Sequence, residues 1–580
     1  MSVSLAFRLL LVSGARVLLA GLPVIVLAQA PSSTPHPIPN SAAPETEVGI
    51  PVTDKLTLEK CSTCHKADEK GNLTRISWIR TTPEGWEEAI KRMVKLNGLA
   101  LSPVDARHIV SYLAKDHGDA PEEVLPYRWF LEKREPFAES IPSPEVRMGC
   151  ASCHPFARPQ TWHRSTAEWD LLVNMHLGYF PGAERTSFRV NLQPDSEGIH
   201  LPPNTVKAPK DPVDLATDIL KGTNGLHSAA WSNWRANMRD LDLKGRWIVT
   251  AYQPGKGRYY GFMTISPGNG PDTFKTETTL TSVTDGSKLT LPGQSVTYSG
   301  YEWRGRSKLE GTGDVRQVMA VAADQSSIEG RWFWGGYNEF GFNVTLHRDN
   351  RDVAILGTNV YPLHAGDKGV SLNILGERFP STVTAADIGL GTGLHITKVV
   401  SVKPTQISLL VDVDPAVVSG FRSVSVKSTV IPEAFSVYDK IDYIKVANDA
   451  SLARLGGGAH DKGYVQFEAI AFNRGVDGVP NTADDVSLGP VTAKWSMEEF
   501  ISHYGDNDKE FIGSIDAGGL FTPAMEGPNP QRRFTTNNAG DVWVIATYQG
   551  KGALQEITAK SYLVVTVPIY MKWDQPEVGQ

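Results

Sequence analysis

The stretches "CSTCH" (Cys61 to His65) and "CASCH" (Cys150 to His154) hold all four cysteines of this 580-residue chain. C-x-x-C-H is the attachment pattern of c-type haem, in which two thiols bond to the porphyrin and the histidine binds the iron. A redox-active dithiol, a four-cysteine zinc site and chance are the alternatives. A zinc site needs no histidine after each pair, and a thioredoxin-like dithiol belongs to a βαβ setting that this sequence lacks. The residues expected to hold two covalent haems are Cys61, Cys64, Cys150 and Cys153, with His65 and His154 on the irons.

A repeat predicts the second iron ligand of each haem. "WIRTTPEGWEEAIKRM" (Trp78 to Met93) and "WHRSTAEWDLLVNMH" (Trp162 to His176) both run Trp-x-Arg-Ser/Thr-Thr, reach a second Trp, and place a possible ligand seven residues later. Seven residues is nearly two helical turns, so that Trp and the ligand share one helix face. We therefore expect Met93 and His176 to complete the two iron sites.

Each of these two ligands has an alternative. Met93 could be a core methionine of an amphipathic helix, and His176 a partly exposed histidine at a helix end. Met175 is turned about 100 degrees away from His176 around the helix. Other residues lack a counterpart in the other copy, namely His108, His117, Met148 and His163. Arg80 and Arg164 do repeat, and they could pair with haem propionates or be solvated.

Local signals place the helices of this region. Thr82 and Pro83 start a helix that Gly98 stops, which predicts a helix over 83–97. "SPVDARHIVSYLAKDHG", from Ser102, predicts a second. "STAE", from Ser165, is a capping box that opens the helix of His176.

Charge and the N-terminus indicate an exported protein. The net charge of -7 offers no basic surface for nucleic acid. The first thirty residues carry Arg8, Arg16, the apolar run "VLLAGLPVIVL" and then "AQA", which is typical of a cleaved secretory signal. No later stretch reaches the ~18 apolar residues that a membrane span needs. We expect a soluble, periplasmic product, because haem attachment takes place after export.

Strand-like runs follow from about residue 212. "GRWIVTAYQPGKGRYYGFMTI" and its neighbours suggest an antiparallel barrel or sandwich, whose aromatic residues would more often fill the interior than line a pocket. Two later regions resemble immunoglobulin-like sandwiches. "DGVPNTADDV" (Asp477 to Val486) is rich in carboxylates but departs from the EF-hand pattern, which favours a hairpin tip over a calcium site.

The expected fold is therefore multidomain, with an α-helical dihaem cytochrome c domain, an antiparallel β-barrel and two immunoglobulin-like β-sandwiches. The boundaries are 1–30 for the signal peptide, 31–211 for the dihaem domain, 212–351 for the barrel, and 352–436 and 437–580 for the sandwiches.

This order of parts resembles the alpha (dihaem cytochrome c) subunit of quinohemoprotein amine dehydrogenase. The stretches "TPEGWEEAIKRM", "NMHLGYFPG", "GYEWRG", "VYDKIDYIKV" and "GPNPQRRFTTNNAG" carry the resemblance, which covers nearly the whole mature chain. It implies a periplasmic heterotrimer with a β-propeller subunit and a small subunit that carries cysteine tryptophylquinone, where primary amines are oxidised. No cysteine is free here to build that quinone, so we expect no catalytic residue on this chain.

Electron transfer follows as the expected role. An amine leaves two electrons on a quinone, whereas external acceptors such as a cytochrome c or a blue-copper protein take one at a time, and two haems can divide the delivery. Met ligation tends to raise a haem potential, so the haem of His65 and Met93 is predicted to have the higher one. A dihaem peroxidase is the main rival, although it needs an open iron site. A haem-bearing binding or adhesion protein is the other.

Overall fold

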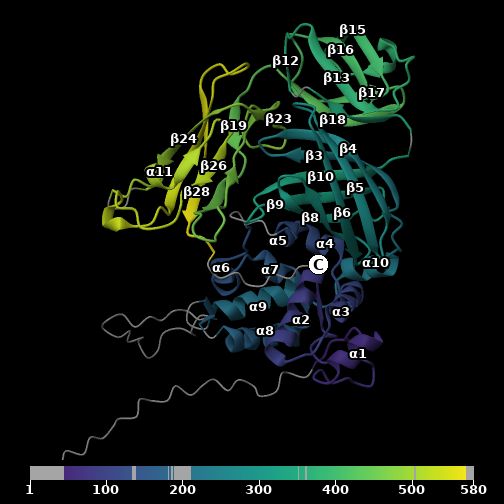
Figure 1. Cartoon of the computed structure of the whole chain (residues 1–580), viewed down its shortest axis with the longest axis vertical. Helices are drawn as coiled ribbons and strands as arrows, with labels where there is room; N and C mark the ends of the chain where they lie inside the picture. Colours follow the sequence, from purple (N-terminus) through teal and green to yellow (C-terminus); the bar gives the residue numbers. More distant parts are fainter. Residues whose placement is uncertain are drawn as a thin grey trace, which may run out of the picture. The chain divides into compact units, whose positions relative to one another are not determined.

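The computed structural model describes residues 45–132, 139–180, 182–183, 187–188, 211–350, 352–359, 362–501 and 505–569. The expected signal peptide over 1–30 lies outside the described residues. Within those ranges, no helix is both long and apolar enough to cross a membrane. Along the chain, short helices come first and a long series of strands follows (Figure 1).

Helices and two very short strands make up the N-terminal part. The bounds are α1 (Lys55–Cys61), β1 (Ile79–Thr81), α2 (Pro83–Asn97), α3 (Pro103–Asp116), α4 (Pro121–Val124), η1 (Leu125–Tyr127), α5 (Arg128–Leu131), α6 (Pro144–Ala151), α7 (Ala157–Gln160), β2 (Trp162–Arg164), α8 (Thr166–Tyr179), α9 (Pro212–Thr223) and α10 (Ala229–Asn237). The predicted caps are confirmed: Thr82, Ser102 and Ser165 each accept a backbone N–H at the start of α2, α3 and α8. Helix α2 ends at Gly98, whose φ of 71° is left-handed.

Strands β1 and β2 join two halves of this helical part, which we call lobe 1 (residues 45–132) and lobe 2 (residues 139–180 with α9). They pair antiparallel, with Arg80 opposite His163. Each strand ends directly before the cap of a ligand helix, α2 in lobe 1 and α8 in lobe 2. Because an antiparallel pair is symmetric about its centre, Arg80 and His163 mark a local pseudo-twofold relation between the lobes.

The strand pairing aligns the two copies of the repeat one residue away from the alignment that their Trp-x-Arg patterns give. The Trp-x-Arg pattern matches Arg80 with Arg164, whereas the caps and the strand register match Arg80 with His163. The difference arises because the first copy has one more residue between its two tryptophans.

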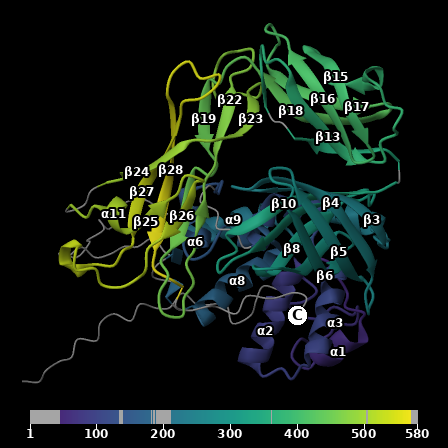
Figure 2. The ribbon, with the colours of Figure 1, turned by 45° about the horizontal axis from the view of Figure 1, so that its top comes forward.

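A closed barrel follows the helices. Its strands are β3 (Gly245–Gln253), β4 (Gly257–Pro267), β5 (Thr273–Ser282), β6 (Lys288–Tyr298), β7 (Glu302–Leu309), β8 (Gly313–Val321), β9 (Ser327–Trp334) and β10 (Phe340–Arg348), and β10 pairs with β3 to close it (Figure 2). Trp247, Trp303 and Trp332 are fully buried in one apolar cluster, so the aromatic residues pack the interior, as predicted. Helices α9 and α10 occupy the start of the expected barrel segment, because Asp211 and Pro212 begin a helix there.

The next β region has two four-stranded sheets around one core. Its strands are β11 (Ala354–Thr358), β12 (Leu363–His364), β13 (Val370–Glu377), β14 (Ile388–Gly389), β15 (Leu394–Lys403), β16 (Gln406–Val413), β17 (Gly420–Val426) and β18 (Thr429–Tyr438). The sheet orders are β11-β13-β16-β15 and β12-β18-β17-β14. Residues from both sheets form one buried cluster, as in a β-sandwich. The immunoglobulin-like assignment stays a prediction.

The last region has three sheets and a second core. Its elements are β19 (Tyr443–Val446), β20 (Ala450–Arg454), β21 (Val465–Gln466), β22 (Ala469–Asn473), β23 (Val486–Val491), β24 (Lys494–Glu499), α11 (Asp508–Phe511), β25 (Gly513–Ile515), β26 (Leu520–Pro523), β27 (Gly540–Tyr548) and β28 (Ile557–Thr566). Strands β22 and β23 form a hairpin whose tip is the acidic loop over 477–485. Asp484 accepts the backbone N–H of Val476 at 2.7 Å and Asp485 that of Asn481 at 2.6 Å, so these carboxylates stabilise the turn.

Candidate haem centres

The first C-x-x-C-H motif closes helix α1. Cys61 is the last helical residue, and the backbone N–H groups of Cys64 and His65 donate to its carbonyl at 3.2 and 2.9 Å. Cys61 packs against a buried cluster that includes Trp86, whereas Cys64 is exposed. Burial raises the pKa of the Cys61 thiol to about 11. The motif thus places one thiol at the edge of the core and one at the surface.

The second motif repeats this arrangement at the end of α6. Cys150 lies in the last turn and packs against a cluster that includes Trp169, and Cys153 is exposed. Burial raises the pKa of Cys150 to about 11 as well. None of the four cysteines forms a disulfide.

Three predicted iron ligands share a hydrogen-bond pattern. The Nδ1 atoms of His65, His154 and His176 lie 2.8, 3.0 and 2.9 Å from the carbonyl oxygens of Thr74, Pro155 and Leu172. Since a carbonyl only accepts, Nδ1 must donate, and Nε2 carries the lone pair that binds a metal. Burial lowers the pKa of all three rings, that of His154 to about 4, and so favours the neutral form that ligation needs.

The competing histidines have no open Nε2. His117 is fully buried, with Nε2 at 3.0 Å from the Ile50 carbonyl. His108 Nε2 lies 2.9 Å from Asp54, and both ring nitrogens of His163 face carboxylates. The hydrogen bonds therefore separate His65, His154 and His176 from these three, which residue spacing alone could not do.

Buried tryptophans fix the ligand helices. The indole N–H of Trp86 on α2 donates to the His117 carbonyl at 2.9 Å, and that of Trp169 on α8 to the Asn224 carbonyl at 3.0 Å. Both indoles are core residues, at 4% and 0% exposure. Met93 lies two turns after Trp86 and is half-buried.

Each ligand helix borders the core cluster of its own motif. In lobe 1, Ile90 of α2 packs on the same cluster as Cys61, and Met93 is one turn further along. In lobe 2, Leu172 of α8 packs on the cluster of Cys150, and His176 is one turn further along.

Family comparison gives the class of protein. The model described as the haem-binding domain of the quinohemoprotein amine dehydrogenase alpha subunit matches residues 52–191, which include both motifs. The models for domains II, III and IV of the same subunit match 240–349, 354–439 and 444–578. The chain belongs to the family of quinohemoprotein amine dehydrogenase alpha subunits. It is therefore a haem-bearing subunit of an oxidoreductase.

The comparisons with curated proteins and with solved structures do not identify a function. No curated protein matches the chain. A redesigned β-barrel is similar at 16% identity, covering 18% of this chain and 90% of its own, with a TM-score of 0.16. Repeats EC1-2 of human protocadherin-24 are similar at 13% identity over 37% of this chain and 96% of theirs, with a TM-score of 0.15.

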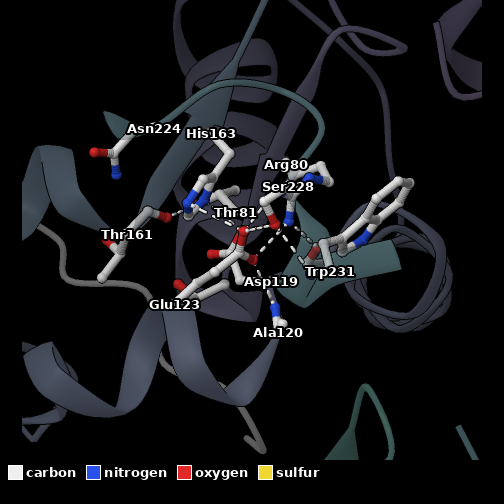
Figure 3. A network of polar contacts seen from close by, with 12 residues as sticks. Arg80, Thr81, Asp119, Ala120, Glu123, Thr161, His163, Asn224, Ser228 and Trp231 are labelled. Atoms are coloured by element: carbon white, nitrogen blue, oxygen red, sulfur yellow. Dashed lines mark hydrogen bonds and ion pairs between the residues drawn. The ribbon is translucent and has the colours of Figure 1, made fainter. Parts of the chain in front are cut away.

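A buried polar network joins lobe 1 to lobe 2 in the helical part of this alpha subunit (Figure 3). Arg80 donates to both carboxylate oxygens of Glu123 at 2.9 Å, to Asp119 at 3.4 Å and, through Nε, to the Leu226 carbonyl at 2.6 Å. Asp119, Glu123 and His163 have atoms within 4.8 Å of one another, as in a metal site, but the Arg80 guanidinium already supplies positive charge there. The prediction that Arg80 is a propionate partner or solvated is wrong, because its donors bind protein groups and it is 0% exposed.

Two ion pairs between the lobes were not predicted from the sequence. Arg75 of lobe 1 donates to Glu168 of lobe 2 at 2.8 Å, and Arg158 of lobe 2 donates to Glu88 of lobe 1. An arginine of each lobe thus pairs with a glutamate on the ligand helix of the other lobe. The two arginines stand at different distances from their motifs, so the repeat gave no signal for them.

Proposed function

We propose that this chain is the dihaem electron-transfer subunit of a periplasmic quinohemoprotein amine dehydrogenase. It would pass electrons from an amine-reduced cysteine tryptophylquinone on a partner subunit to an external one-electron acceptor, a cytochrome c or a blue-copper protein. The residues proposed to hold the haems are Cys61, Cys64, Cys150 and Cys153 by thioether bonds and His65, Met93, His154 and His176 as iron ligands. The observation that carries the proposal is that each of the three histidines of this set has Nδ1 on a backbone carbonyl and no hydrogen bond to Nε2 from the described residues.

The proposed partners are a β-propeller subunit and a small quinone-bearing subunit. When bound, the haems supply one-electron oxidation and reduction, whereas a quinone reduced by an amine holds two electrons. All four cysteines of the chain lie in the two motifs, so a quinone built from a cysteine belongs on a partner. The proposal gives the amine chemistry to that partner.

The chain's own residues would hold two ligand sets in a fixed relation. Carbonyl acceptors orient the three imidazoles, and the buried indoles of Trp86 and Trp169 anchor the two ligand helices. The β1–β2 pair and the Arg80 network join the lobes between those helices. Rigid support of this kind keeps the distance between two redox groups constant.

Haem counting and partner dependence test the proposal. The chain, exported in cells with c-type haem ligation machinery, is expected to give two haems by the pyridine haemochrome assay, and one after Cys150→Ala with Cys153→Ala. A primary amine should reduce the haems only when both partner subunits are present. Reduction by the amine without partners, or none with them, would refute the proposal.

A further inference from the structure

Four arginines and two glutamates form ion pairs on and beside the two ligand helices. We call this group the arginine seam; its members are Arg75, Arg92, Arg158, Arg164, Glu88 and Glu168. Glu88 pairs with Arg158 and, at 3.5 Å, with Arg92; Glu168 pairs with Arg75 at 2.8 Å and with Arg164 at 3.9 Å. Four positive charges thus share two carboxylates, and the seam has a surplus of positive charge.

Arg164 is the member of the seam with a buried donor that has no partner among the described residues. Its side chain is 4% exposed, and its Nε has no partner among the described residues. Its contact with Glu168 is longer than a hydrogen bond, and its guanidinium lies over the Trp162 ring at 4.6 Å from the centroid. Burial lowers the pKa of Arg164 to about 9. Burying a cation without hydrogen bonds is costly, which indicates that another group completes this site.

Arg80 is a buried arginine whose donors have protein partners. Arg80 is equally buried, but its Nε and both Nη atoms donate to oxygen atoms of the protein. The two arginines share a position in the Trp-x-Arg pattern, yet only Arg80 is satisfied by its own chain within the described part of the structure.

Arg164 lies beside the second haem centre. Its guanidinium is 4.6 Å from the centroid of the Trp162 ring and 5.7 Å from that of the Trp169 ring, and both indoles belong to the cluster on which Cys150 packs. A haem carries two propionate carboxylates, and a guanidinium fork is suited to binding a carboxylate. The unpaired Nε of Arg164 therefore lies near the place where the haem attached at this motif would supply an anionic partner.

We propose that Arg164 binds a propionate carboxylate of the haem attached at Cys150 and Cys153. The inference rests on the proposed dihaem function. A buried cation favours the reduced, less positive form of a nearby redox group, so Arg164 also holds the potential of this haem up.

The test uses the full chain with both haems and two variants. Arg164→Gln removes the charge and the fork; Arg75→Gln removes a 40% exposed charge that pairs with the same Glu168. In an infrared redox difference spectrum, with the haem propionates labelled with carbon-13, we expect Arg164→Gln to shift the labelled carboxylate band and Arg75→Gln to leave it in place. The potential of the His154 haem should fall further in Arg164→Gln than in Arg75→Gln.

The remaining outcomes distinguish failure of the Arg164 proposal from failure of the dihaem function. An unchanged labelled band in Arg164→Gln would overturn the role of Arg164, and so would equal shifts in the two variants. If Arg164→Gln does not fold, a crystal structure of the wild-type holoprotein decides: an Arg164 guanidinium apart from both propionates overturns the proposal. Fewer than two haems per wild-type chain would instead refute the proposed function.

Discussion

Replacing Arg80 by methionine should destabilise the helical part by about 3 kcal/mol at pH 7. Burial alone would raise the pKa of Glu123, but the hydrogen bonds and charge of Arg80 and the charge of His163 outweigh it and hold that pKa at about 2, against the usual 4.5. At 1.36 kcal/mol per pKa unit, the difference corresponds to about 3 kcal/mol. Loss of one partner of a buried ion pair typically costs about 3 to 5 kcal/mol, which agrees in size.

The difference in stability between the wild type and Arg80→Met should depend on pH. The folded pKa of Glu123 is depressed, so its contribution is present above about pH 4.5 and is lost as the pH falls toward about 2. Without Arg80, burial dominates and raises the folded pKa of Glu123, and the Arg80→Met protein becomes relatively more stable on acidification. The stability gap between wild type and Arg80→Met should therefore narrow from pH 7 to pH 5.

Urea unfolding of the full holoprotein measures both effects, with circular dichroism in the haem Soret band reporting on the helical part. Arg128→Met is the matched control, because its ion pair with Glu329 at 3.3 Å is 43% and 56% exposed and should be worth no more than about 1 kcal/mol. A loss in Arg80→Met below about 1 kcal/mol, or a gap that does not change with pH, would refute the reasoning.

Three further perturbations have defined outcomes. Met93→His should lower the higher of the two haem potentials in a redox titration, and an unchanged upper potential would show that Met93 is not a ligand. Gly98→Ala should cost about 1 kcal/mol in urea unfolding, since Gly98 holds a left-handed φ of 71° at the end of α2; no loss would contradict that account. Burial raises the pKa of Glu302 to about 8, so the wild type should lose stability as the pH rises from about 4.5 to about 8. Glu302→Gln should lack that loss, and parallel curves from pH 6 to pH 9 would contradict the assignment.

Local signals in the sequence were enough for the ligand helices. Thr82, Pro83 and Gly98 act on their nearest neighbours, and α2 begins and ends where they predict. The Ser165 cap did the same for α8, although the Glu168 side chain pairs with Arg75 and does not complete the predicted capping box. Spacing from the second tryptophan then singled out Met93 and His176 as expected ligands.

Contacts between segments that are far apart in the chain could not be predicted from the sequence. The β1–β2 pair has three residues on each strand, too few for a periodic pattern, and it fixes which residues of the two copies are equivalent. The environment of Arg80 depends on Asp119, in the loop after α3, and on Glu123 of α4, which lie 39 and 43 residues further along the chain. The alternation of the strands fitted a barrel and a sandwich equally, and closure rests on the pairing of β10 with β3.

Near-infrared magnetic circular dichroism of the oxidised full chain tests the central claim most directly, because its charge-transfer bands report the axial ligands of each low-spin haem. The account predicts two bands, one typical of His/Met ligation for His65 with Met93 and one typical of His/His ligation for His154 with His176. Two bands of the same ligation, a high-spin haem in place of either, or a single haem would contradict it.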